Sequence, residues 1–195
     1  SLQGLIIKAQ SGFFTVETPQ GFVVCQLRGK LKRGRATGDI AAIGDRVHIT
    51  VSTDGSGAIE EIEPRKRAIV RLDPRPQGEY QQILLANPDQ AVFVFSCANP
   101  DPRLKMLDRY LVTAEAADLP SLIVINKLDL AWKNPSLDED LEIYRQIGYP
   151  ILSVSALTGE GIEELKQSLQ SKLSVLVGKS GVGKTSLLNA IQPGL

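Results

Sequence analysis

The residues from Gly178 to Thr185, which read GKSGVGKT, have the composition and spacing of a phosphate-binding loop. In the pattern G-x-x-x-x-G-K-[ST], glycines let successive backbone N–H groups face phosphate oxygens, and the N-terminus of a helix lies behind them. Lys184 is expected to reach the β- and γ-phosphates and the Thr185 hydroxyl to bind Mg²⁺, so these two are the candidate catalytic residues. The predicted phosphate-binding residues are Gly178, Lys179, Ser180, Gly181, Val182, Gly183, Lys184, Thr185 and Ser186.

A second motif, Asn126-Lys127-Leu128-Asp129, directly follows the apolar run 121–125. The Asp129 carboxylate can accept hydrogen bonds from N1–H and the 2-amino group of guanine, a donor pair that adenine lacks. An adenine nucleotide would leave that carboxylate unpaired, which costs free energy. Lys127 can lay its stem along the base, and Asn126 can tie this loop to the phosphate-binding loop. The motif therefore predicts GTP or GDP as the ligand.

The turn from Ser155 to Gly161, which reads SALTGEG, is the expected third part of the nucleotide site. The backbone N–H of Ala156 could donate to guanine O6, and Ser155 could brace the turn. Taken alone, Ser-Ala before a glycine-containing turn is equally typical of an ordinary turn. The phosphate-binding pattern likewise has a plain alternative, a glycine-rich strand-to-helix turn with a solvated lysine.

Strand and helix patterns alternate from residue 90 onward. Continuous apolar runs are typical of buried parallel strands, and right-handed crossovers would join them into a three-layer α/β sheet. Ligands of such sheets lie beyond the C-terminal ends of the strands. The expected strands are 91–97, 121–125, 151–154 and 173–177.

The helices between these strands have recognisable starts and apolar faces. Asp101 is expected to cap a helix with Pro102 in its first turn, and Ser136 with Glu139 forms a capping-box pattern for a helix ending at Gly148. Apolar residues at helical spacing predict the buried faces. They are Leu104, Leu107, Leu111 and Ala114 in one helix and Ile162, Leu165 and Leu169 in another.

The first 68 residues have a different pattern, with five short strand-like runs separated by turn residues. This predicts a small β-barrel; an OB-like barrel is favoured and an SH3-like barrel is the competing fold. We expect a barrel domain at 1–68, a linker at 69–80 that contains Pro74, Pro76 and Gly78, and a partial nucleotide-binding domain at 81–195. The five runs lie at 4–9, 12–18, 21–29, 45–51 and 57–63.

A basic segment, which reads RGKLKRGRATGD at residues 28–39, begins at the end of the third run. It contains five cations within eight residues, and none of those eight residues is acidic. Such a segment is typical of phosphate binding, so we expect it to contact RNA; a solvated loop that only aids solubility is the alternative. The weaker cluster at 65–67 is interpreted as part of a linker. The candidate RNA-binding residues are Arg28, Lys30, Lys32, Arg33 and Arg35.

Composition narrows the remaining possibilities. The net charge is zero overall, but residues 1–68 carry +3 and residues 69–195 carry −3, which suggests two parts with different partners. No apolar run approaches the ~20 residues that span a bilayer, so we expect a cytoplasmic protein. We also expect a monomer. Cys25 and Cys97 are expected to be buried free thiols, and His48 a strand side chain.

The order of the motifs is unusual. The two segments expected to contact the base, Asn126 to Asp129 and Ser155 to Ala156, are called the base-reading segments, and they precede the phosphate-binding loop. In Ras-like G domains the phosphate-binding loop comes first, so this order indicates a circular permutation. The chain resembles the bacterial ribosome-small-subunit-dependent GTPases (RsgA/YjeQ) over nearly its whole length. The strings that carry the resemblance are AIGDRV, ANPDQAVFVFSCANPDPRLKMLDRYLV, INKLDL, SALTGEGIEEL and GKSGVGKTSLLNAI.

The resemblance implies a GTPase that acts late in maturation of the small (30S) ribosomal subunit, is stimulated by that subunit and uses the barrel against 16S rRNA. It implies GTP/GDP and Mg²⁺ as ligands, with Asn126, Lys127, Asp129, Ser155 and Ala156 at the base. Asp89 and the Asp108-Arg109 pair also match the family and are interpreted as structural.

The family pattern continues beyond residue 195, with switch segments that include a D-x-x-G motif and with a zinc-binding domain. The 195 residues do not include these parts, and Asp54–Gly57 fits D-x-x-G only inside a barrel turn. An alternative function is therefore a guanine-nucleotide-dependent RNA adaptor that does not hydrolyse GTP. A third possibility, an ATP-using protein, is disfavoured by Asp129.

Overall fold

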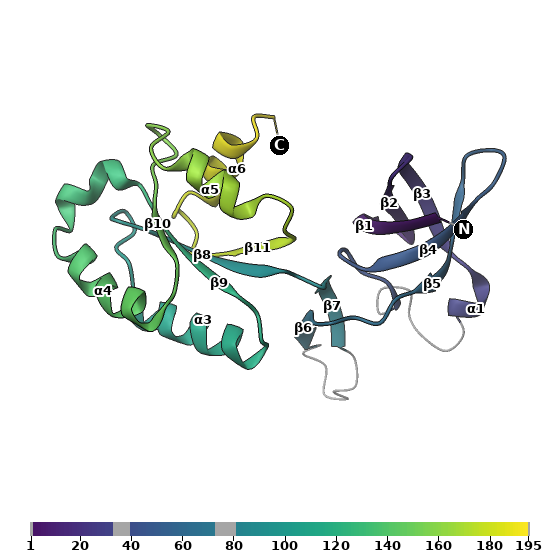
Figure 1. Cartoon of the computed structure of the whole chain (residues 1–195), viewed down its shortest axis with the longest axis horizontal. Helices are drawn as coiled ribbons and strands as arrows, with labels where there is room; N and C mark the ends of the chain where they lie inside the picture. The colour runs from purple at the N-terminus through teal and green to yellow at the C-terminus, as the bar shows by residue number, and fades with distance from the viewer. Residues whose placement is uncertain (1, 33–39, 73–80, 195) are drawn as a thin grey trace. The chain divides into compact units, whose positions relative to one another are not determined.

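The computed structural model describes residues 2–32, 40–72 and 81–194 and divides into two compact units, 1–88 and 89–195 (Figure 1). Each unit has its own apolar core. The basic residues Arg33 and Arg35 lie outside the described residues, as do Pro74, Pro76 and Gly78.

Five antiparallel or mixed strands close the barrel of the first unit in the order β1-β2-β3-β5-β4. β5 pairs in parallel with β3 and antiparallel with β4, which is the strand order of OB-folds. Alternate side chains such as Phe14, Val16 and Cys25 fill the core. The OB-like prediction is therefore confirmed. The elements are β1 (Leu2–Gln10), β2 (Phe13–Thr18), β3 (Gly21–Leu27), the short helix α1 (Gly29–Lys32), β4 (Arg46–Val51) and β5 (Gly57–Ile62).

A buried ion pair lies at the entrance to β4. The Asp45 side chain is fully buried, and Arg65 donates to both of its oxygens, from Nε and from one terminal nitrogen, at 2.7 Å each. The Ala42 N–H donates to the same carboxylate at 2.8 Å. Arg65 therefore belongs to the barrel and not to a solvated linker, because its charge compensates a carboxylate inside the unit.

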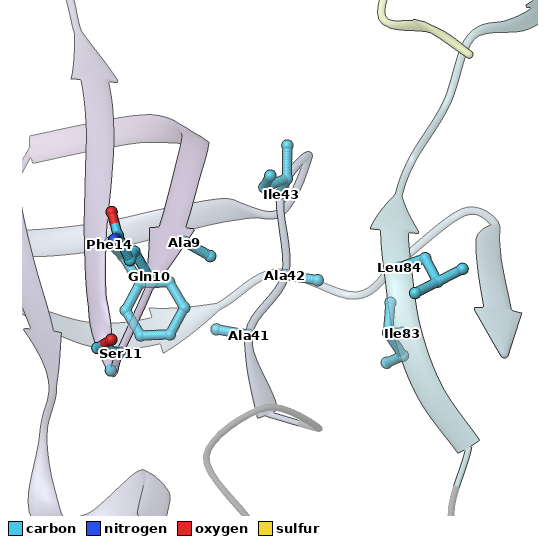
Figure 2. A pocket seen from close by; sticks show the side chains of 10 residues that line it. Ala9, Gln10, Ser11, Phe14, Ala41, Ala42, Ile43, Ile83 and Leu84 are labelled. Carbon is cyan, nitrogen blue, oxygen red and sulfur yellow. The ribbon is translucent and has the colours of Figure 1, made fainter. Parts of the chain in front are cut away.

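A two-stranded hairpin, β6 (Ala68–Leu72) with β7 (Gln81–Ala86), follows the barrel strands. Backbone hydrogen bonds such as Ala86 N–H to Ile43 O at 2.8 Å attach it to the barrel. Residues of the barrel and the hairpin line a cleft of about 370 Å³. In Figure 2, Ala42 and Ile43 lie across from Ile83 and Leu84. The predicted linker at 69–80 thus begins inside β6, and the division into 1–68 and 81–195 stays a prediction.

The second unit is built on a parallel four-stranded sheet in the order β10-β9-β8-β11. β8 is buried along its whole length, as its continuous apolar sequence predicts. One apolar cluster packs α3 and α4 on one face, and a second packs α5 and α6 on the other. The elements are β8 (Gln90–Ser96), α3 (Leu104–Ala116), β9 (Ser121–Asn126), the 3₁₀ helix η1 (Leu128–Lys133), α4 (Leu137–Ile147), β10 (Ile151–Ser153), α5 (Ile162–Leu169), β11 (Ser174–Val177) and α6 (Lys184–Ile191).

Two predicted helix starts were wrong in detail. α3 begins at Leu104 after Arg103 in extended conformation, so Asp101 and Pro102 precede it. Ser136 does precede α4, but its backbone is already helical and its side chain makes no capping bond. A capping side chain reaches the free N–H groups from a non-helical backbone, and Ser136 does not have one. The stop at Gly148 is confirmed, with a left-handed backbone at that residue.

Two family-like acidic residues make structural contacts. The Asp89 carboxylate accepts from the Leu173 N–H at 2.6 Å and its own N–H donates to the Leu173 carbonyl, which fixes the entrance of β11 beside β8. Asp108 accepts from the Tyr144 hydroxyl at 2.7 Å and joins α3 to α4. Burial and the Asp108 contact raise the pKa of that tyrosine.

Candidate nucleotide-binding site

Four loops leave the sheet at the C-terminal ends of its parallel strands. Residues 97–103 follow β8, Lys127 to Asp129 follow β9, Ser155 to Gly161 follow β10, and Gly178 to Gly183 follow β11. Because the strands are parallel and neighbouring, these loops gather at one edge of the sheet. This is the edge at which ligands of open α/β sheets bind.

The Asn126 side chain connects three of these loops. It is almost fully buried, and its Nδ2 donates to the Val182 carbonyl in the phosphate-binding loop at 2.9 Å. Its Oδ1 accepts from the Ala156 N–H at 3.1 Å. The link that was predicted from Asn126 to the phosphate-binding loop is present. The Ala156 N–H, which we expected to face guanine O6, donates to Asn126 in this structure.

Ser155 orients the Asp129 carboxylate. The buried Ser155 hydroxyl donates to Asp129 Oδ1 at 2.6 Å and accepts from the Thr158 N–H at 3.2 Å. Ser155 is therefore the brace of its turn that the sequence predicted. Among the described residues, Ser155 is the single donor to Asp129, so the second carboxylate oxygen keeps its capacity to accept.

The phosphate-binding loop has glycines where side chains would not fit. Gly181 and Gly183 have positive φ angles of 86° and 94°, in the left-handed region that favours glycine. A Cβ on Gly178 would lie 2.4 Å from the Val94 carbonyl oxygen, and one on Gly183 would lie 2.4 Å from Asn126 Nδ2. These glycines let the loop lie directly against β8 and the base-reading loop.

Backbone donors of this loop remain available for an anion. From Lys179 to Thr185, the one backbone N–H that meets an acceptor within the described part of the chain is that of Val182, at 3.4 Å from the Lys179 carbonyl. Lys184 Nζ donates to the Gly178 and Lys179 carbonyls at 2.7 and 3.2 Å, so its ammonium lies over the loop. Free N–H groups, a helix N-terminus and an ammonium together fit a polyphosphate.

Sequence reasoning missed the segment that follows β8. Lys127, in left-handed conformation, donates from Nζ to the Asn99 carbonyl. The Ser96 hydroxyl donates to the Pro100 carbonyl at 2.6 Å, and Pro100 lies beside Gly181. Residues 96–100 therefore hold the base-reading Lys127 and lie beside the phosphate-binding loop. The Asn-Pro-Asp-Pro string was interpreted only as a helix start, which concealed this role.

The donors for a metal are few at this edge. Thr185 is the second residue of α6 and exposed, so its hydroxyl is accessible as an oxygen ligand. Mg²⁺ is typically held by one or two protein oxygens together with phosphates and water, and Thr185 fits that role. In residues 2–32, 40–72 and 81–194, no group of three or more His, Cys, Asp or Glu side chains could hold a metal ion.

The basic segment is less free than its sequence suggests. Arg28 and Lys30 both approach the Glu60 carboxylate of β5, at 3.0 and 3.7 Å. Glu60 is far away in sequence, and the barrel brings it next to these cations. The hydrogen bond from the Thr50 hydroxyl lowers the pKa of Glu60 most, and the charges of Arg28 and Lys30 lower it further. The Lys32 side chain, Arg33 and Arg35 lie outside the described residues.

The discounted D-x-x-G match is a turn between β4 and β5. Asp54 Oδ1 accepts from the N–H and the hydroxyl of Ser56 at 3.0 and 2.7 Å. This short-range pattern stabilises the turn and is remote in sequence and topology from the parallel sheet.

Along the chain, an OB-like barrel is followed by a parallel sheet, and the base-reading segments precede the phosphate-binding loop. This order defines the class of circularly permuted P-loop GTPases. Two family models match the chain: the RsgA N-terminal domain over residues 3–59 and the RsgA GTPase over residues 62–195. The chain belongs to the RsgA GTPase family.

Similar proteins agree with this assignment. The small ribosomal subunit biogenesis GTPase RsgA of Bacteroides fragilis is 38% identical over 199 residues, covering 100% of this chain and 64% of the relative. The same-named protein of Moorella thermoacetica is 40% identical over 195 residues, covering 100% and 61%.

Solved structures show the same fold. YjeQ from Thermotoga maritima superposes with a TM-score of 0.81 at 39% identity, over 100% of this chain and 66% of that one. YloQ, described as a circularly permuted GTPase, superposes with a TM-score of 0.79 at 34% identity, over 98% and 64%. The chain thus spans less than two thirds of the length of these relatives. No helix among the described residues is long and apolar enough to cross a membrane.

Proposed function

We propose that the protein binds and hydrolyses GTP and acts in late maturation of the small (30S) ribosomal subunit, with the barrel on 16S rRNA and with hydrolysis stimulated by the subunit. The observation that carries the nucleotide part is the Asn126 carboxamide, which holds the base-reading loops and the phosphate-binding loop together. The family membership and the names of the relatives support the ribosomal part.

Guanine would be selected by the Asp129 carboxylate. Ser155 holds one of its oxygens, and the other can accept from the N1–H and 2-amino edge of the base. A site built around an unpaired acceptor rejects a ligand without the matching donors by a large factor. Lys127 would cover one face of the base. The Ala156 N–H donates to Asn126 in this structure, so it would reach guanine O6 only by exchanging that partner for the base. GDP and GTP should therefore bind, and ADP should not.

The phosphates would be held by the N–H groups of the loop from Gly178 to Thr185 and by Lys184. These donors stabilise negative charge that builds up on the phosphate oxygens during transfer, which is the main contribution of a protein to this reaction. The Thr185 hydroxyl would hold Mg²⁺. When bound, that ion neutralises charge on the phosphates.

The basic segment would contact RNA. Because Glu60 partly neutralises Arg28 and Lys30, these two should contribute less to RNA affinity than free cations would. A factor with this role would work as a cytoplasmic monomer. Zinc, which the resemblance implies for the sequence beyond residue 195, has no assigned ligands in this chain.

Nucleotide titrations test the first part of the proposal. Trp132, the single tryptophan, lies in η1 three residues after Asp129 and is 73% exposed, so its fluorescence should report ligand binding. We expect GDP and GTP to change the signal at concentrations at least about a hundred times lower than ADP and ATP do. Equal affinities for guanine and adenine nucleotides would contradict the assignment of Asp129.

Turnover assays test the second part. Full-length protein should hydrolyse GTP slowly alone and faster with purified small subunits, and large subunits are the matched control. Guanine-specific binding without any turnover, with or without small subunits, would leave the RNA adaptor as the function.

A further inference from the structure

The outer sides of α3 and α4, which cover the same face of the sheet, carry apolar side chains that the core does not use (Figure 1). Val112 of α3 is 69% exposed, and Ile143 and Ile147 of α4 are 59% and 65% exposed. The helices pack on the sheet through other residues, such as Leu111 and Leu141. A single exposed apolar residue is ordinary, but three on neighbouring helices indicate an interaction surface.

Two hydrogen bonds show which sides of these helices face each other. The Tyr144 hydroxyl of α4 donates to the Asp108 carboxylate of α3 at 2.7 Å. The Tyr149 hydroxyl, just after α4, donates to the Glu115 carboxylate at 2.9 Å. The two bonds lie about two helical turns apart along α3. The seam between the helices therefore runs from the first bond to the second.

Helical spacing places the exposed apolar residues beside this seam. Val112 follows Asp108 by four residues, so it lies on the same side of α3. Ile147 follows Tyr144 by three residues and lies on the side of α4 that faces α3, with Ile143 one turn before it. The three side chains thus gather along the outer edge of one seam. We call Val112, Ile143 and Ile147 the α3–α4 patch.

The residue types in the α3–α4 patch do not serve the helices that carry them. Valine and isoleucine are β-branched, and the restriction of their side chains makes them poorer helix formers than alanine, leucine or glutamate. At an exposed position, packing inside the protein does not offset this cost. Burial of the patch against a partner would offset it.

Carboxylates outnumber cations around the α3–α4 patch. Glu139 and Asp140 are exposed, one turn before Ile143, and form no ion pair with any described residue. Two carboxylates of α3 accept hydrogen bonds from neutral tyrosine hydroxyls and keep their negative charge. On the far side of α4, Arg145 pairs with carboxylates of its own helix. The groups beside the patch are the carboxylates of Asp108, Glu115, Glu139 and Asp140 and the cations Lys105 and Arg109.

We propose that the α3–α4 patch binds a basic amphipathic helix of a protein partner, with apolar side chains on the patch and lysines or arginines facing the carboxylates. Helices commonly bind by laying an apolar face on an apolar surface, and complementary charge fixes their orientation. The excess of carboxylates would repel RNA, and a second copy of this chain would bring the same acidic surface. The inference does not depend on nucleotide or RNA binding.

A fluorescently labelled synthetic helix of about 18 residues, with leucine on one face and lysine on the other, tests the proposal against the whole protein. Fluorescence anisotropy should show saturable binding. A peptide of the same composition in scrambled order and a peptide with glutamate in place of lysine should both bind at least about tenfold more weakly. Failure of the amphipathic peptide to bind, or equal binding of the scrambled one, would contradict the proposal.

Truncation of the apolar side chains locates the binding. Val112→Ala and Ile147→Ala should each weaken binding of the amphipathic peptide about fivefold or more. Val51→Ala, at a barrel side chain that is 43% exposed, is the control and should change it less than about twofold. The midpoint of thermal unfolding of Ile147→Ala should be unchanged or higher, because alanine is the better helix former. A lower midpoint, or equal peptide binding in all three variants, would overturn the proposal.

Neutralisation of the carboxylates tests the charge. Glu139→Gln combined with Asp140→Asn should weaken peptide binding and flatten its salt dependence. Glu163→Gln on α5, which packs on the other face of the sheet, should alter neither. An unchanged salt dependence in the double variant would exclude a basic partner at this site. GDP affinity should be the same in all of these variants, so a failure of the proposed nucleotide binding would leave the peptide result intact.

Discussion

Two aspartates, one in each unit, sit in hydrogen-bond networks with opposite consequences. The Asp45 carboxylate in the barrel is fully buried and both of its oxygens are taken by Arg65, with the Ala42 N–H added. The Asp129 carboxylate in the sheet unit is held through one oxygen by Ser155. Both Asp45 oxygens therefore have partners within the protein, whereas the second oxygen of Asp129 can still accept a hydrogen bond from a ligand. An oxygen left without a protein partner is what the predicted ligand-binding role of Asp129 requires, whereas Asp45 has none to offer.

Of the substitutions that test this comparison, Asp129→Asn should have the largest effect, and the effect should be on GDP affinity. It exchanges an acceptor for a donor facing the guanine edge, so GDP affinity should fall about a hundredfold or more while the free energy of unfolding stays within about 0.5 kcal/mol. Trp132 fluorescence titration and urea unfolding measure the two. Xanthosine diphosphate, which has a carbonyl in place of the 2-amino group, should bind the variant better than GDP does. Asp138→Asn, at an exposed carboxylate of α4, is the control.

Arg65→Met should show the reverse pattern. It leaves the buried Asp45 charge without its partner, which typically costs about 3 kcal/mol or more in stability, and it touches no nucleotide loop. The barrel should unfold at lower urea concentration by circular dichroism. GDP affinity of the folded protein should be unchanged. A variant as stable as the wild type would show that the Asp45 network is not a structural one.

Gly183→Ala sharpens the comparison inside the sheet unit, with Gly148→Ala as its control. Both positions have positive φ, 94° and 109°, so both variants carry backbone strain of about 1 kcal/mol. Only at Gly183 would the new Cβ meet Asn126, whereas Gly148 has nothing within 4 Å. We expect GDP affinity to fall about tenfold in Gly183→Ala and to stay unchanged in Gly148→Ala. Equal affinities of the two variants would show that the close approach of Gly183 to Asn126 does not matter for nucleotide binding.

The smallest expected effect concerns the barrel thiol. Burial raises the pKa of Cys25 from 9.0 to about 11. The folded state therefore keeps this proton when the unfolded chain has lost it, so the contribution to stability is complete below pH 9.0 and is lost as the pH rises toward 11. Cys25→Ala should unfold with a weaker pH dependence over this range than the wild type. An identical slope would mean that the thiol does not contribute.

The sequence was informative wherever the signal is local. Strand periodicity predicted the five barrel strands and the four sheet strands, and the spacing within 126–129, 155–161 and 178–185 predicted loops that the structure brings to one edge. The nucleotide roles of these residues stay predictions. Periodicity works here because each strand and each loop is encoded within a few neighbouring residues.

Contacts between distant residues could not be read in this way. Glu60 neutralises part of the basic segment from another strand, and Asp45 pairs with Arg65 across 20 residues. The role of residues 96–100 depends on Lys127, which follows a different strand. The β6–β7 hairpin was missed because prolines and a glycine at 74–78 are typical of a linker. In each case the partner is fixed by the closure of the barrel or by the order of the sheet.

The pairing of β11 with β8 has a consequence for how the molecule is made. A ribosome synthesises the base-reading residues first, and Val182, to which Asn126 donates, emerges 56 residues later. Domains tend to fold as units during synthesis. Until β11 and the loop after it have been made, the nascent sheet lacks β11 and the Asn126 amide lacks its Val182 acceptor. A guanine nucleotide can then engage all three loops only after α6 has been synthesised. Its binding energy would favour the finished sheet over the nascent one.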